Sequence, residues 1–71
     1  MKFDYNKLRG RIVENGLTQE QLANKINMSK GTFSQRINNQ YHFSQDEIIS
    51  ICKILNITRE NIGMYFFNQK V

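Results

Sequence analysis

Between Lys30 and Gln35 the sequence carries side chains that can hydrogen-bond the edges of DNA bases. Lys30 can donate to guanine O6 and N7, and Gln35 can form a two-bond pair with adenine N6 and N7. Ser34 can pair with several bases, and the methyl group of Thr32 can contact the methyl group of thymine. The alternative for Gln35 is a solvated surface amide, and for Lys30 it is a general phosphate contact. Base recognition is therefore one hypothesis for this segment.

The distribution of charge favours a polyanionic partner. The chain has a net charge of +4, and no Asp or Glu lies between Gln21 and Gln45. That stretch contains Lys25, Lys30 and Arg36. A surface without carboxylates suits DNA, since each acid would repel a nearby phosphate. The alternative is a chance gap in a polar surface.

The positions of the polar residues depend on two predicted helices. Thr18 and Gln21 form a capping-box pattern that predicts the start of one helix, and Ser29 is a typical N-cap for the next. Asn27 between them tolerates the left-handed backbone of a tight turn. Two short helices joined so closely cross steeply, and the second is pushed out as a ridge that fits the major groove. The inward residues are Leu22, Ala23, Ile26, Met28, Phe33 and Ile37.

The remaining pattern is also helical. We predict a helix from about Tyr5 to Asn15, capped by Asp4 and ended by Asn15-Gly16, and a helix that opens at Ser44 with a second capping box to Glu47. A last helix or turn is expected from Thr58 to about Gly63. The fold class is therefore all-α, with five short helices in a single domain over residues 1–71.

Several function classes are disfavoured. The sequence shows no His, Asp and Glu cluster, no Gly-rich phosphate loop and no metal-ligand spacing, so we expect no enzyme, metal, cofactor or small-molecule substrate. The single cysteine, Cys52, lies in an apolar run and is expected to be a buried, inert thiol. There is no apolar run of membrane-spanning length and no signal-peptide pattern, so a soluble cytoplasmic protein is expected.

The residues Thr18-Gln19-Glu20-Gln21-Leu22-Ala23 and the pattern Ser-x-x-Thr-Phe-Ser from Ser29 resemble the Cro and CI repressor domains of temperate phages. More broadly, the chain is similar to the xenobiotic-response-element, or lambda repressor-like, class of helix-turn-helix regulators. The resemblance runs from about Tyr5 to Ile62, and the helix-turn-helix itself spans residues 18–38. Three positions depart from the family pattern: Asn27, where the family usually has Gly; Arg36, where an apolar residue is common; and Gly31, which weakens the first turn of the helix after Ser29.

The resemblance implies that the helix after Ser29 presents its first half to the bases and that neighbouring residues hold the phosphates. The expected base contacts are Lys30, Gly31, Thr32, Ser34 and Gln35. The expected phosphate contacts are Gln19, Ser29, Arg36, Asn38, Asn39 and Tyr41.

One domain of this size reads few base pairs, so a homodimer on a palindromic DNA operator is expected. The apolar tail, residues 57–71, is the predicted dimer surface, through Ile57, Met64, Tyr65, Phe66 and Phe67. The alternative is that this tail packs on the chain's own helices. We therefore predict a sequence-specific, double-stranded DNA-binding transcriptional regulator, in the manner of a Cro-like repressor. The alternative function is a protein-interaction module, such as an antitoxin that uses the helix-turn-helix only for autoregulation.

Overall fold

Hydroxyl side chains cap helices α2, α3 and α4 at the residues that the sequence predicts. In the computed structural model, which describes residues 2–70, helix α2 (Gln19–Lys25) follows Thr18, whose Oγ1 accepts the Gln21 N–H at 3.1 Å while Gln21 Oε1 accepts the Thr18 N–H at 2.9 Å. Ser44 and Glu47 form the same capping box before helix α4 (Gln45–Leu55). Ser29 caps helix α3 (Lys30–Ile37). These predictions are confirmed.

The first and last helices differ slightly from their predicted bounds. Helix α1 spans Asn6–Glu14, and Asp4 Oδ1 accepts the Asn6 N–H at 2.9 Å. After a 3-10 turn, η1 (Arg59–Asn61), helix α5 spans Ile62–Phe66. The predicted end at Gly63 is therefore wrong by three residues, because Phe66 continues the apolar spacing and is anchored in the core.

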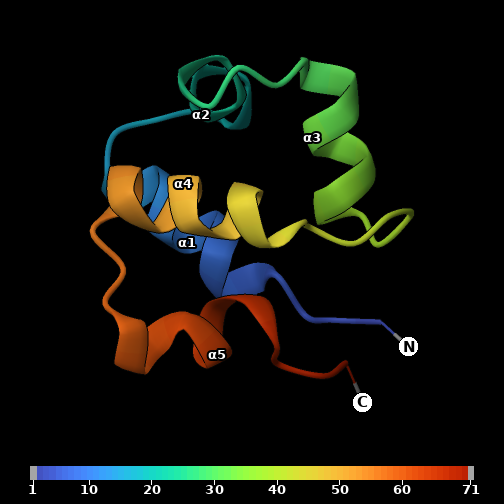
Figure 1. Cartoon of the computed structure of the whole chain (residues 1–71), viewed down its shortest axis with the longest axis vertical. Coiled ribbons are helices and arrows are strands. Elements are labelled where there is room, and N and C mark those ends of the chain that lie inside the picture. The colour runs from blue at the N-terminus through green and yellow to red at the C-terminus, as the bar shows by residue number, and fades with distance from the viewer. Residues whose placement is uncertain (1, 71) are drawn as a thin grey trace.

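The turn between α2 and α3 has the predicted geometry. Asn27 adopts a left-handed backbone with φ of 58°. Figure 1 shows α2 nearly end-on at the top and α3 along the right edge, so the two axes cross steeply. Helix α3 is thereby held at the edge of the molecule, on the side opposite α5 in this view.

The centre of the core is an aromatic cluster around Phe43. Its ring lies 5.4 Å from Tyr5, 5.8 Å from Phe33 and 5.5 Å from Phe66, in each case with the rings steeply inclined. Edge-to-face pairs of this kind are favourable beyond the area they bury. The loop after α3 is therefore fixed to α1, α3 and α5 through one side chain.

The two ends of the described chain lie side by side. Phe3 and Gln69 form an isolated antiparallel bridge, the Asp4 N–H donates to Asn68 O at 2.6 Å, and the Lys70 N–H donates to Lys2 O at 3.0 Å. We call residues 2–4 and 68–70 the terminal ribbon; Figure 1 shows the two segments running side by side toward the lower right.

The apolar tail is divided between core and surface. Phe66 is 1% exposed and Ile57 is 8% exposed, whereas Phe67 and Met64 are exposed. The prediction that Ile57 and Phe66 form a dimer surface is wrong, since the monomer's own core occupies both side chains. Within residues 2–70, no helix is long and apolar enough to cross a membrane.

Candidate nucleic-acid interface

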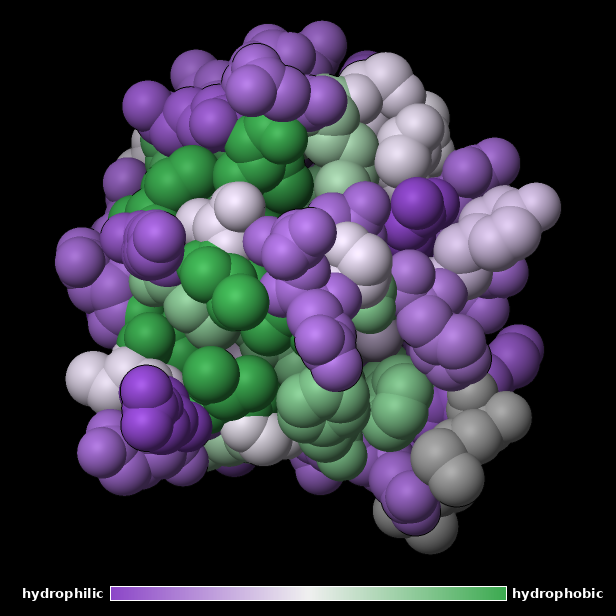
Figure 2. Space-filling model, in the orientation of Figure 1, coloured by the Kyte–Doolittle hydropathy of each residue, from purple (hydrophilic) through white to green (hydrophobic). Residues whose placement is uncertain are grey.

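Helix α3 presents a polar face to solvent. Phe33 and Ile37 are each 1% exposed and fix the rotation of the helix on the core. As a result Lys30, Ser34 and Gln35 point away from the protein interior and are exposed. Gly31 and Asn38 lie on the same exposed face, while Thr32 is half-buried. Hydrophilic surface extends along this edge of the molecule, at the right of Figure 2.

Arg36 leaves this face for the neighbouring helix. Its Nε lies 3.4 Å from Glu47 Oε1, and its guanidinium carbon lies 5.6 Å from the centre of the Tyr41 ring. Only 22% of the Arg36 side chain is exposed. The predicted phosphate contact by Arg36 is therefore not supported. Its position, where the family commonly has an apolar residue, is explained by its stem packing between α3 and the start of α4.

Asn39 also has a different role from the predicted phosphate contact. Its Oδ1 accepts the Phe3 N–H at 2.8 Å, and its Nδ2 donates to Phe3 O at 2.9 Å. Both ends of the amide are thus used to hold the terminal ribbon. This arrangement gives the Asn39 side chain a structural role in place of the predicted phosphate contact.

At the C-terminal end of α3, Asn38 remains exposed within a small network. Its Nδ2 donates to Ser34 Oγ at 3.1 Å, and its Oδ1 accepts Arg9 Nη2 at 3.2 Å. The same Arg9 nitrogen donates to Ile37 O. Arg9 therefore satisfies one backbone carbonyl, that of Ile37, at the negative end of α3, which positive charge stabilises.

The sequence analysis gave no role to Arg9 or Lys70. Both line a polar hollow of about 110 Å³ beside Asn38 and Asn39. Their approach to α3 depends on how α1 and the terminal ribbon pack, and no local motif signals it. They add positive charge beside the polar face of α3.

The other predicted contacts remain in accessible positions. Gln19 is exposed in the first turn of α2, and Tyr41 is 60% exposed in the loop after α3. The Ser29 hydroxyl accepts the Thr32 N–H and donates to Thr32 Oγ1 at 2.8 Å, so its observed role is to cap α3.

Two observations on the described residues concern metal binding and thiol reactivity. No group of three or more His, Cys, Asp or Glu side chains is placed to hold a metal ion in residues 2–70. Cys52 is buried, and burial raises the pKa of its thiol, which disfavours the reactive thiolate.

Comparison with known proteins places the chain in a family. The family model described as "Protein of unknown function (DUF739)" matches residues 1–69. The chain belongs to this family. No curated protein matches it.

A solved structure is similar over the whole chain. The solution structure of the modulator of repression (MOR) of the temperate bacteriophage TP901-1 from Lactococcus lactis is 35% identical in sequence, with a TM-score of 0.82. The match covers 100% of this chain and 96% of that protein. The chain is therefore similar, in sequence and in its all-helical fold, to a small phage regulatory protein.

Proposed function

We propose that this protein is a DNA-binding transcriptional regulator of the Cro/CI helix-turn-helix type, acting in the control of phage repression inside a bacterial host. The observation that carries the proposal is the polar face of α3, which is exposed, lies next to a steeply crossing α2 and has no carboxylate between Gln21 and Gln45. The similarity to the TP901-1 modulator of repression supports a role in phage regulation. No catalytic step is part of this proposal.

The side chains on this face divide into two roles. Lys30 and Gln35 have the donors and acceptors that read guanine and adenine, and Ser34 lies one residue from Gln35 on the same face. Gly31 carries no side chain, so the backbone of the first turn of α3 can approach the DNA closely. Gln19 and Asn38 are the remaining exposed phosphate contacts from the predicted set, and Tyr41 extends them into the loop.

Two copies on a palindromic operator would double the number of contacts. After Ile57 and Phe66 are assigned to the core, the available apolar side chains of the tail are Met64, half-buried Tyr65 and Phe67. This reduced surface is the proposed dimer contact.

The first test is the salt dependence of binding to sites selected from a random DNA pool. The logarithm of the association constant should fall linearly with the logarithm of salt concentration, with a slope of about 0.9 for each phosphate contacted. Lys30→Gln should weaken binding, and the slope should fall by about 1 if Lys30 contacts phosphate. Lys53→Gln, which removes an exposed lysine from the last turn of α4, is the matched control. A flat salt response of the unmodified protein would contradict DNA binding.

Base reading by Gln35 has a separate test. Gln35→Ala should cost about 1–3 kcal/mol on the best selected site and much less on random DNA. Gln45→Ala, at an exposed position in the first turn of α4, should affect both DNAs equally. Equal losses of binding free energy for Gln35→Ala on both DNAs would show that the Gln35 side chain does not read bases.

A protein-interaction module is the second candidate. It is favoured by the similarity to the TP901-1 modulator of repression, and by exposed apolar side chains at Ile49, Met64 and Phe67. Figure 2 shows apolar surface gathered on the viewer's face over α4 and α5. Failure to select any preferred DNA site, together with tight binding to a regulatory protein, would favour this candidate.

A further inference from the structure

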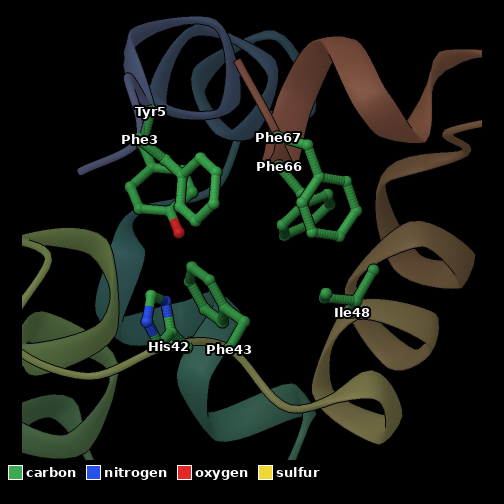
Figure 3. A pocket seen from close by; sticks show the side chains of 7 residues that line it. All are labelled: Phe3, Tyr5, His42, Phe43, Ile48, Phe66 and Phe67. Carbon is green, nitrogen blue, oxygen red and sulfur yellow. The ribbon is translucent and has the colours of Figure 1, made fainter. Parts of the chain in front are cut away.

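An apolar pocket of about 190 Å³ lies between the N-terminal segment, the loop after α3, α4 and α5. Its walls are six aromatic rings and Ile48, shown in Figure 3. The floor consists of buried side chains, among them Tyr5, Phe43 and Phe66. The pocket belongs to the monomer and is separate from the exposed side chains of α3.

The rim of the pocket is formed by rings that pack edge to face. The Phe3 ring lies 5.9 Å from His42 on one side and 5.9 Å from Phe67 on the other. His42 and Phe67 are exposed, and Phe3 is half-buried. These contacts hold the rim around an opening instead of letting it collapse onto Phe43.

Tyr5 and His42 are the lining residues of this apolar space that carry polar groups. Tyr5 is only 3% exposed, and its hydroxyl makes no hydrogen bond with any residue in the range 2–70. Figure 3 shows the hydroxyl directed into the space between Phe3 above and His42 and Phe43 below. Burial raises the pKa of Tyr5, so the hydroxyl stays protonated and can donate. Within residues 2–70 no fully buried side-chain polar atom lacks a partner, so the Tyr5 hydroxyl is accessible through the opening of the pocket and is available to pair with a ligand.

We propose that this pocket binds a small, uncharged aromatic molecule with one hydrogen-bonding group, which pairs with the Tyr5 hydroxyl. An apolar cavity of about 150 Å³ accommodates benzene, so a pocket of about 190 Å³ fits one ring with a small substituent. The aromatic walls favour edge-to-face contact with a ring. They disfavour an ion, because nothing on the floor compensates a buried charge. The inference does not depend on DNA binding.

The probes are phenol, which carries the polar group, and toluene, which has nearly the same shape without it. Titration of the full chain, followed by amide NMR shifts, should saturate for both, with changes centred on Tyr5, Phe43 and Phe66. Phenol should bind more tightly. Tyr5→Phe keeps the ring, and it should weaken phenol about tenfold and leave toluene unchanged.

Two similarly exposed residues, Phe67 and Ile49, provide a test variant of the pocket and its control. Phe67→Ala removes one side of the rim and should weaken both probes, whereas Ile49→Ala, at a similarly exposed residue outside the pocket, should weaken neither. Nuclear Overhauser contacts between phenol and Phe43 in the unmodified protein test the site without any substitution. Shifts that grow linearly without saturation, equal phenol binding by Tyr5→Phe, or equal losses in both alanine variants would overturn the proposal.

Discussion

Asn39 connects the end of α3 to the beginning of the chain. It has a left-handed backbone with φ of 66°, and its amide pairs with both backbone groups of Phe3, 36 residues away in sequence. An asparagine after a helix predicts a turn, and the turn is present. The partner of its side chain depends on the tertiary packing, so the sequence suggested a phosphate contact instead.

Replacing Asn39 with glycine isolates these two hydrogen bonds, because glycine adopts a positive φ without strain. We expect Asn39→Gly to lower the free energy of unfolding by about 1–3 kcal/mol in urea denaturation. Asn56→Gly is the control: Asn56 has φ of 57°, and its side chain has no hydrogen bond within residues 2–70, so little change is expected. Equal losses in both variants would show that the Phe3 bonds contribute nothing.

Two buried acids should make stability fall at alkaline pH. Burial raises the pKa of Cys52 above 9.0 and that of Tyr5 above 10.0. The unfolded chain then loses these protons first, so their contribution is fully present below the ordinary values and is lost as pH rises through the raised ones. We expect the melting temperature to fall above about pH 9. Cys52→Ala should remove the part of this decline that begins at the lower pH, because the thiol titrates before the Tyr5 hydroxyl. Calorimetry at a series of pH values measures the melting temperature.

At the scale of the helices, local patterns were sufficient for most of the architecture. The capping boxes at Thr18 and Ser44, the cap at Ser29 and the left-handed turn at Asn27 all involve residues close in sequence, and all are present. The side-chain pairs that connect one helix to another were not predicted. Arg36 pairs with Glu47 across two elements, and no spacing rule indicates this.

Glu47 makes one contact within its own capping box and one contact with another helix. Its Oε1 accepts the Ser44 N–H at 2.8 Å and also lies 3.4 Å from Arg36 Nε of α3. We expect Glu47→Gln to keep the cap and cost less than about 1 kcal/mol, because the ion pair is partly exposed. Glu47→Ala should cost about 1 kcal/mol more, measured in urea.

The equivalent change at the other capping box provides the comparison. Gln21→Ala removes the hydrogen bond from the Thr18 N–H to the Gln21 side chain. Because Gln21 forms no ion pair, this change should cost less free energy of unfolding than Glu47→Ala. A larger loss for Glu47→Gln than for Gln21→Ala would mean that the contact with Arg36, rather than the cap, dominates.

For the molecule as a whole, the sequence left open whether the aromatic tail is core or interface. The structure separates two adjacent residues: Phe66 is 1% exposed and Phe67 is 53% exposed. Helical spacing places Phe66 inward only once α5 is known to continue past Gly63. The packing of α5 against α1 is a tertiary contact, and it cannot be predicted from the amino-acid composition.

We expect Phe66→Ala to cost about 3–5 kcal/mol, most of the stability of a domain this small. The melting temperature should fall by roughly 12 °C or more. Phe67→Ala should cost less than about 1 kcal/mol. Calorimetry measures both, and sedimentation shows whether Phe67→Ala weakens self-association. Similar thermal losses in the two variants would contradict the separation of core from surface.

The terminal ribbon has a practical consequence for anything attached to the chain. Both ends leave the molecule beside Asn39, at the foot of the helix proposed to enter the groove. A purification tag, fluorophore or fused domain at either end would stand next to that helix and would crowd an approaching duplex. Labels for binding measurements belong instead at an exposed residue outside the terminal ribbon and α3, for example at an engineered cysteine replacing Val13 of α1.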